Sequence, residues 1–181
     1  MRKQIFIING GGGVGKDSFV SLVNKSFKYS KFNKSNNPVM NFSSVDKVKK
    51  IATMIGWNGD KTEKDRKFLS DLKLLTTEYN DMSFNSMKEK VNEFKSNDST
   101  MLFLHIREAE EIERAKVEFD AKTILVIRDS VEHITSNVSD KDVFNYNYDI
   151  VIDNNGGILK LHSKAATFVR DYVLDNLKTE Y

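Results

Sequence analysis

Cysteine is absent from this 181-residue sequence, and proline occurs only once. The lack of cysteine excludes disulfide bridges, cysteine nucleophiles and thiolate metal sites. No apolar run approaches the roughly 20 residues that a membrane-spanning helix requires. The apolar stretch after Met1-Arg2-Lys3 is too short for a signal peptide. A cytoplasmic enzyme or binding protein is therefore the expectation.

The net charge is also small, because 28 basic residues nearly balance 26 acidic ones to leave +2. A nucleic-acid reader normally concentrates excess positive charge on one face, so we expect no nucleic-acid polymer as partner. The length suits one domain with a sizeable core. We expect residues 1–181 to form that domain, with no membrane partner and with a homodimer left open.

Short apolar runs alternate with helical patterns along the chain. The runs expected to form strands are Ile5–Ile8, Pro38–Phe42, Met101–Ile106, Thr123–Ile127 and Asp149–Ile152. Helices are expected over Asp17–Phe27, through most of 45–94, over Ala109–Phe119 and over Ile158–Leu177. Nearly solid apolar strands that alternate with helices indicate a parallel sheet covered on both faces. The predicted fold is α/β, a three-layer α/β/α arrangement around five parallel strands.

Three apolar stripes at helical spacing support the predicted helices. The stripes are Phe19, Val20, Val23 and Phe27; Phe68, Leu72, Leu75 and Tyr79; and Phe84, Met87, Val91 and Phe94. Asp60 and Glu63 have the spacing of a capping box ahead of the second stripe.

The strongest chemical signal is the glycine-rich segment Gly10–Lys16, which fits the Walker A pattern G-x-x-x-x-G-K between a predicted strand and a predicted helix. Glycines let successive backbone N–H groups point at phosphate oxygens, and the helix that follows presents its positive end to the same anion. This P-loop predicts an ATP-binding site. Its residues are Gly11, Gly12, Gly13, Val14, Gly15, Lys16, Asp17 and Ser18.

One position departs from the usual P-loop. The residue after the lysine is normally Ser or Thr, whose hydroxyl binds Mg²⁺, but here it is Asp17, with Ser18 next. Asp17 is a candidate to hold Mg²⁺ directly or through water, since this ion prefers hard oxygen ligands. Alternatively, Asp17 is an acidic first-turn residue favoured by the helix dipole, with Ser18 near the phosphates. Both readings stay open, and both residues are candidate metal ligands.

The stretch Gly15-Lys16-Asp17-Ser18 resembles the G-K-D-[S/T] ending of the P-loop in bacteriophage-type deoxynucleoside monophosphate kinases. Animal-type phosphomevalonate kinases have a related G-K-D. The resemblance implies a P-loop kinase fold with strand order 2-3-1-4-5 and an ATP-dependent phosphotransferase of nucleotide metabolism.

The same resemblance suggests where the phosphate acceptor binds. The segment 42–49 looks like the one in which those kinases admit the acceptor, which makes Lys47 a candidate substrate-binding residue. Arg66 falls in a helix that resembles the one carrying an acceptor-phosphate arginine, and Arg107 sits like an arginine at the end of the third strand. Planar guanidinium groups bind phosphate bidentately, which suits both arginines to this role.

The remaining candidates lie between the last two predicted strands. Arg128 ends a strand at the edge where parallel sheets bind ligands, so it is a catalytic candidate together with Lys16 and Arg107. The polar segment at about 130–145 occupies the lid position of the resembling family. It offers only Lys141 and His133 as basic groups, where many such lids carry several arginines.

Two functional hypotheses follow. The first is transfer of the γ-phosphoryl group of ATP, with Mg²⁺, to a (deoxy)nucleoside monophosphate; dephospho-coenzyme A and phosphomevalonate are competing acceptors. The second is an ATP-binding regulatory or interaction protein without useful turnover. The arginines favour the first. The sparse lid favours the second, as does the lack of a clear Walker B aspartate after the third strand, where Glu108 is an alternative acid.

Overall fold

A computed structural model describes residues 3–130 and 142–174. Five parallel strands form one sheet in the order β2-β3-β1-β4-β5, as predicted. In that order the strands are Val39–Ser43, Met101–His105, Gln4–Asn9, Lys122–Ile127 and Ile150–Asp153. Because all five run in one direction, their carboxyl ends and the loops that follow them meet at the same edge of the sheet.

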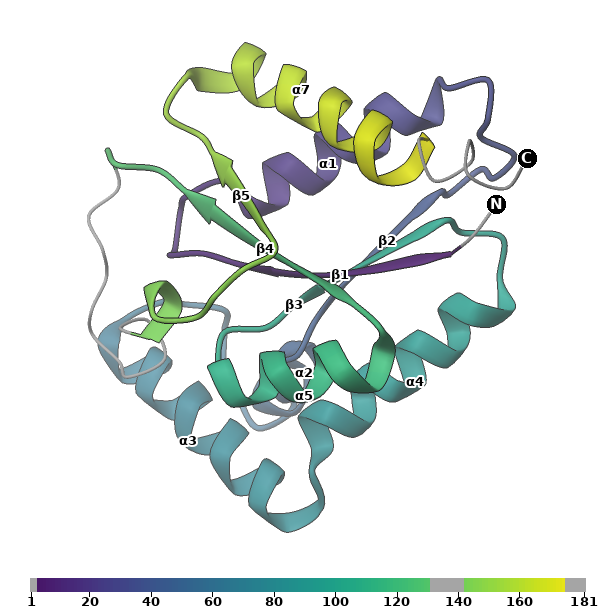
Figure 1. Ribbon diagram of the computed structural model, residues 1–181. Coiled ribbons are helices and arrows are strands. Elements are labelled where there is room, and N and C mark those ends of the chain that lie inside the picture. The colour runs from purple at the N-terminus through teal and green to yellow at the C-terminus, as the bar shows by residue number, and fades with distance from the viewer. Residues whose placement is uncertain (1–2, 131–141, 175–181) are drawn as a thin grey trace.

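Helices cover both faces of this sheet (Figure 1). On one face lie α1 (Lys16–Lys28) and α7 (Gly157–Phe168), followed by the π-helical turn η2 (Val169–Leu174). The other side carries α2 (Asp46–Met54), α3 (Glu63–Asn80), α4 (Met82–Ser96) and α5 (Ala109–Phe119). A short 3₁₀ helix, η1 (Asp142–Phe144), precedes β5. The three-layer α/β/α prediction is confirmed. Within the described residues, no helix is both long enough and apolar enough to cross a membrane.

The central strand β1 separates two hydrophobic clusters. Phe6 and Ile8 point into the cluster beneath α1 and α7, where Phe168 meets Phe6 edge-on at 4.9 Å between ring centroids. Ile5 and Ile7 point into the cluster formed with α4 and α5. This alternation follows from the two-residue period of a strand. Since both faces of β1 are buried, the loop that leaves its carboxyl end starts from a rigid base.

The apolar stripes of α1 and α4 are buried, but the stripe of α3 is not. Leu75 is 64% exposed and Tyr79 86% exposed, and none of the side chains of α3, all within the described residues, is fully buried. The reason is its position: α3 packs against α2 and α4 instead of against the sheet. An apolar stripe on such a helix has no sheet surface to cover.

One predicted helix start is wrong. The capping box before α3 is made by Thr62 and Asp65, two residues beyond the predicted pair Asp60 and Glu63. The predicted helix Ile158–Leu177 is α-helical as far as Phe168 and continues as η2 to Leu174, and its last three positions lie outside the described residues. Most of the predicted lid, with His133 and Lys141, likewise lies outside them.

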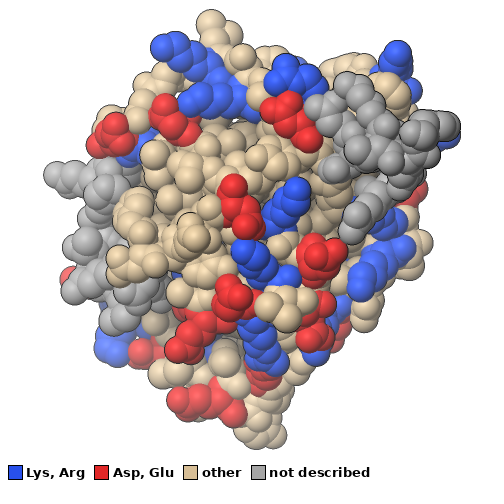
Figure 2. All heavy atoms as spheres, in the orientation of Figure 1, with Lys and Arg blue, Asp and Glu red and all other residues tan. Residues whose placement is uncertain are grey.

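Acidic and basic side chains are intermixed on the face that carries α4 and α5 (Figure 2). Three ion pairs there join neighbouring elements: Lys88 with Glu118 at 2.9 Å, Lys116 with Asp149 at 3.0 Å, and Arg114 with Asp81 at 2.6 Å. The near balance of charge in the sequence is thus repeated locally on this face.

Candidate active site

The P-loop connects β1 to α1, and its shape depends on glycine at two positions. Gly10 has φ 143°, and a Cβ atom there would lie 2.4 Å from the carbonyl oxygen of Val126. Gly15, the N-cap of α1, has φ 100°, and a Cβ there would lie 2.4 Å from Asn154 Nδ2. Both the positive φ and the lack of space exclude a side chain. The loop therefore lies against β4 and the end of β5.

Two buried asparagines hold this loop at its two ends. Asn9 Oδ1 accepts a hydrogen bond from the Gly10 amide at 2.8 Å, and Asn154 Nδ2 donates to the Val14 carbonyl at 2.8 Å. Asn9 is fully buried and Asn154 is 8% exposed. Neither residue was predicted from the sequence as a support for the loop. The available signal was a polar residue at the end of each of two apolar strands.

Lys16 lies over the loop and is bonded to it. Its Nζ donates to the carbonyl oxygens of Gly10 at 2.6 Å and Gly11 at 2.8 Å. The first amides of α1 have no acceptor within the helix, and no side chain caps them. A cationic lysine and the positive end of a helix therefore converge on one short loop, which is the arrangement that binds phosphate.

Asp17 and His105 face each other beside the loop. Asp17 is 91% exposed, and its Oδ1 lies 3.8 Å from His105 Nε2, which is also 2.7 Å from Asn41 Oδ1. Burial lowers the pKa of His105, and the nearby Asp17 carboxylate only partly opposes this effect, so the imidazole is neutral at pH 7. An exposed carboxylate beside the P-loop fits the oxygen ligation that Mg²⁺ prefers.

The two accounts of Asp17 predict different results for Asp17→Ala and Asp17→Asn. If Asp17 holds Mg²⁺, Asp17→Ala weakens ATP binding about tenfold with Mg²⁺ and has little effect in EDTA, with Asn intermediate because it keeps one oxygen ligand. If Asp17 acts only on the helix dipole, both variants change ATP binding equally with and without Mg²⁺. Calorimetric titration with ATP under both conditions separates the two accounts.

Arg107 and Arg128 both follow strands at the edge where the P-loop lies. Arg107 comes two residues after β3, and Arg128 comes directly after β4. Both side chains are exposed, and Arg128 Nε donates to Ser130 Oγ at 3.1 Å. Because β1 lies between β3 and β4, the two arginines flank the loop on either side.

The other two substrate-binding candidates lie on helices. Lys47 is on α2, and its Nζ is 3.8 Å from Glu89 of α4, a contact that joins two helices and does not involve the loop. Arg66 is exposed on α3, seven residues before Lys73. Seven residues are close to two helical turns, so Arg66 and Lys73 share one face of α3 about 10 Å apart along the axis.

Lys73 joins that face of α3 to the residues that follow β3. Its Nζ lies 2.6 Å from Glu108 Oε2 and 2.8 Å from Glu111 Oε2, and its side chain is 13% exposed. Burial alone would lower the pKa of Lys73, but the two carboxylates raise it, so the lysine stays charged. Glu108, the alternative to a Walker B acid, is therefore bonded to α3 in this structure.

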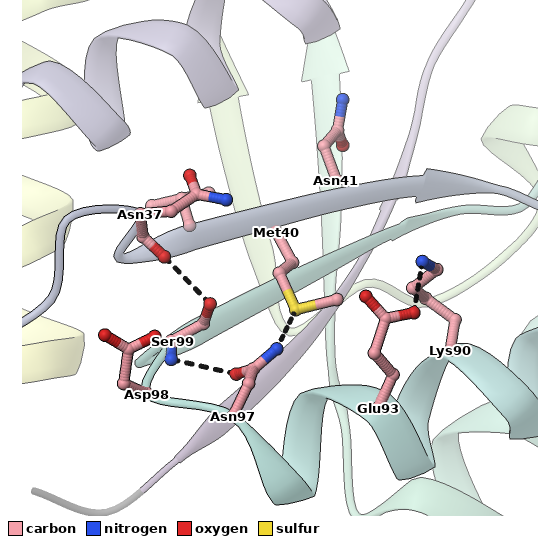
Figure 3. Close-up of a pocket in the computed structure, with 9 residues that line it drawn as sticks. Asn37, Met40, Asn41, Lys90, Glu93, Asn97, Asp98 and Ser99 are labelled. Atoms are coloured by element: carbon pink, nitrogen blue, oxygen red, sulfur yellow. Dashed lines mark hydrogen bonds and ion pairs between the residues drawn. The ribbon is translucent and has the colours of Figure 1, made fainter.

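A cavity of about 320 Å³ lies elsewhere, between the amino-terminal half of β2 and the last turns of α4 (Figure 3). Its polar side chains bond mainly to one another and to nearby backbone. Asn97 Nδ2 is 2.9 Å from Met40 Sδ, and Ser99 Oγ donates to the carbonyl of Asn37. These contacts link the end of α4 to the edge strand β2 at the amino end of the sheet. The cavity therefore lies away from the edge of the sheet that carries the P-loop.

The sheet order, with a P-loop after its central strand, defines the fold of the P-loop kinases. Thymidylate kinase from Ehrlichia chaffeensis is similar in structure, with a TM-score of 0.54 at 10% identity over 93% of this chain and 100% of that one. Shikimate kinase from Aquifex aeolicus vf5 gives 0.53 at 10% identity over 94% and 99%. The tunicamycin resistance protein of Deinococcus radiodurans gives 0.53 at 14% identity over 93% and 96%. No family model and no curated protein matches the sequence.

Proposed function

We propose that this protein transfers the γ-phosphoryl group of ATP to a small phosphorylated acceptor, with a (deoxy)nucleoside monophosphate as the preferred one. The proposal rests on the P-loop, where Lys16 and the amino-terminal end of α1 converge on one site for an anion. Arg107 and Arg128, which follow the neighbouring strands β3 and β4, lie on either side of this loop. Structures named as shikimate kinase and thymidylate kinase share this fold, which supports the kinase class.

On the donor side, the loop amides and the start of α1 bind the β- and γ-phosphates. Lys16 exchanges its bonds to the Gly10 and Gly11 carbonyls for bonds to phosphate oxygens, so its charge moves onto the transferring group. Arg128 adds positive charge beside the loop. This positioning and charge neutralisation supply most of the catalysis in phosphoryl transfer.

On the acceptor side, Arg107 and Arg66 hold the monophosphate through charge-assisted hydrogen bonds. An acceptor phosphate oxygen attacks the γ-phosphorus, a new P–O bond forms, and the bond to ADP breaks. The attacking oxygen is already anionic at neutral pH, so the reaction requires no general base.

The residues beside the loop fit Mg²⁺. Asp17 offers an exposed carboxylate, and Ser18 offers an exposed hydroxyl on the same helical turn. When bound, the ion neutralises part of the charge on the β- and γ-phosphates. Asp17 would hold it on the protein side, while neutral His105 next to Asp17 adds no competing positive charge.

A panel of acceptors tests the proposal. ATP consumption is measured with ribo- and deoxynucleoside monophosphates, dephospho-coenzyme A and phosphomevalonate, and product formation is followed chromatographically. We expect one or more nucleoside monophosphates to stimulate ADP formation and to give the matching diphosphate. The Lys16→Ala protein is the control for contaminating kinases. Tight ATP binding with no stimulation by any acceptor would favour the regulatory ATP-binding protein instead.

A further inference from the structure

Asn9 contacts three separate parts of the candidate site. It is the last residue of β1 and is fully buried. Its Oδ1 accepts from the Gly10 amide at 2.8 Å, while its Nδ2 donates to the Arg107 carbonyl at 3.2 Å and to the Tyr148 hydroxyl at 2.7 Å. One amide therefore contacts the first residue of the P-loop, the residue that carries the acceptor-side guanidinium, and the chain just before β5.

The two donor bonds use the whole donor capacity of the amide. An asparagine side chain has two N–H groups, and here one points to Arg107 and the other to Tyr148. Tyr148 consequently fixes the rotation of the amide plane. With that plane fixed, the Gly10 amide and the Arg107 carbonyl stay at a set separation. The Asn9 amide therefore holds the P-loop in a fixed position relative to the backbone of Arg107.

Tyr148 has a close counterpart in Tyr146. The two rings pack edge-on with centroids 4.9 Å apart, but their hydroxyls go to different places. The Tyr146 hydroxyl donates to Glu113 Oε2 of α5 at 2.7 Å, away from Asn9. Burial raises the pKa of Tyr148 to about 12, so its phenol keeps its proton and leaves a lone pair for the Asn9 donor.

We propose that Asn9 and Tyr148 form a positioning pair that sets the P-loop relative to Arg107. The inference rests on the proposed phosphotransfer function and adds to it two residues that do not touch substrate. In-line transfer is sensitive to misplacement of about 1 Å, so a loosened Asn9 amide reduces turnover even when both ligands still bind.

The matched variants Tyr148→Phe and Tyr146→Phe test this pair. Each removes one hydroxyl and keeps the ring, and both proteins are assayed for ATP affinity by calorimetry, for kcat and KM with the best acceptor of the panel, and for thermal midpoint. We expect Tyr148→Phe to lower kcat about tenfold and to raise the Kd for ATP about threefold or more, with Tyr146→Phe within about twofold of wild type. Thermal midpoints of the two variants should agree within about 3 °C.

A double-mutant cycle shows whether Tyr148 acts through Asn9. Asn9→Leu keeps a side chain of similar size but removes the amide that contacts Tyr148, so Tyr148→Phe should change kcat less than about twofold in that background. Equal losses in Tyr148→Phe and Tyr146→Phe, or a full additional loss in the Asn9→Leu background, would overturn the inference. Wild-type protein that does not bind ATP would instead overturn the proposed function. If the wild-type protein binds ATP but phosphorylates no acceptor, the inference is decided by the ATP affinities of Tyr148→Phe and Tyr146→Phe.

Hydrogen exchange on wild-type protein provides a test that requires no variant. Because Asn9 contacts both the loop and Tyr148, ATP binding should slow amide exchange in the peptide that contains Tyr146 and Tyr148 by about threefold or more. Exchange that is unchanged there, while it slows in the P-loop, would contradict the coupling.

Discussion

Lys16→Ala should reduce phosphotransfer by about 100-fold or more, because removal of a single preorganised charge-stabilising group typically has an effect of this size. The Lys16 ammonium is held over the loop by the Gly10 and Gly11 carbonyls, so it is in place before ATP arrives. Its side chain belongs to neither hydrophobic cluster, and the variant should fold normally. Calorimetric titration measures the loss of ATP affinity, and the ATP-consumption assay measures the loss of phosphotransfer.

Lys25→Ala is the matched control for that experiment. Lys25 is an exposed lysine in the last turn of the same helix, α1, so its removal changes the net charge equally without touching the loop. We expect wild-type ATP affinity in this control and a circular dichroism spectrum unchanged in both variants. Persistent ATP binding and turnover in Lys16→Ala would mean that the loop is not the phosphate site.

Arg107→Lys should weaken use of the acceptor at least about tenfold in kcat/KM while the Kd for ATP stays almost constant. Lysine keeps the positive charge but loses the planar fork that binds a phosphate bidentately, and charge-assisted hydrogen bonds contribute about 1.5–3 kcal/mol. The backbone of Arg107 remains held by Asn9, so the substitution tests the guanidinium group alone. Initial rates over a range of acceptor concentrations measure the effect.

Arg114→Lys provides the comparison for this second experiment. Arg114 is on α5, where it pairs with Asp81 at 2.6 Å, and its replacement should leave the kinetics unchanged. A loss of ATP affinity in Arg107→Lys would place Arg107 on the donor side. No change in either parameter would remove Arg107 from the acceptor site.

The strands, their order and the P-loop could be predicted because their signals are local or follow from the resemblance. Five apolar runs marked the strands to within one residue at each end, and the glycine spacing marked the loop. Helical spacing also predicted helices in the region 45–94, where α2, α3 and α4 lie. Periodicity identifies an amphipathic helix but not what lies opposite its apolar face, so the exposure of Leu75 and Tyr79 could not be predicted.

The supports of the loop could not be predicted, because they join residues far apart in the sequence. Asn9 and Tyr148 are separated by 139 positions, and Asn154 and Val14 by 140. Such contacts appear only once β1, β4 and β5 lie side by side. The roles assigned to Lys47, Arg66, Arg107 and Arg128 remain predictions, since they depend on where an acceptor binds.

The exposed packing of α3 divides the molecule into parts of unequal local stability. Residues of β1 lie between two hydrophobic clusters, so their amides open to solvent only when most of the protein unfolds. In α3 no side chain is fully buried. Lys73 links this helix to the start of α5 through its ion pairs with Glu108 and Glu111. We therefore expect α3 to open locally at a much smaller free energy than β1. The P-loop thus follows β1, which we expect to unfold last, while Arg66 lies on α3, which we expect to unfold among the first elements.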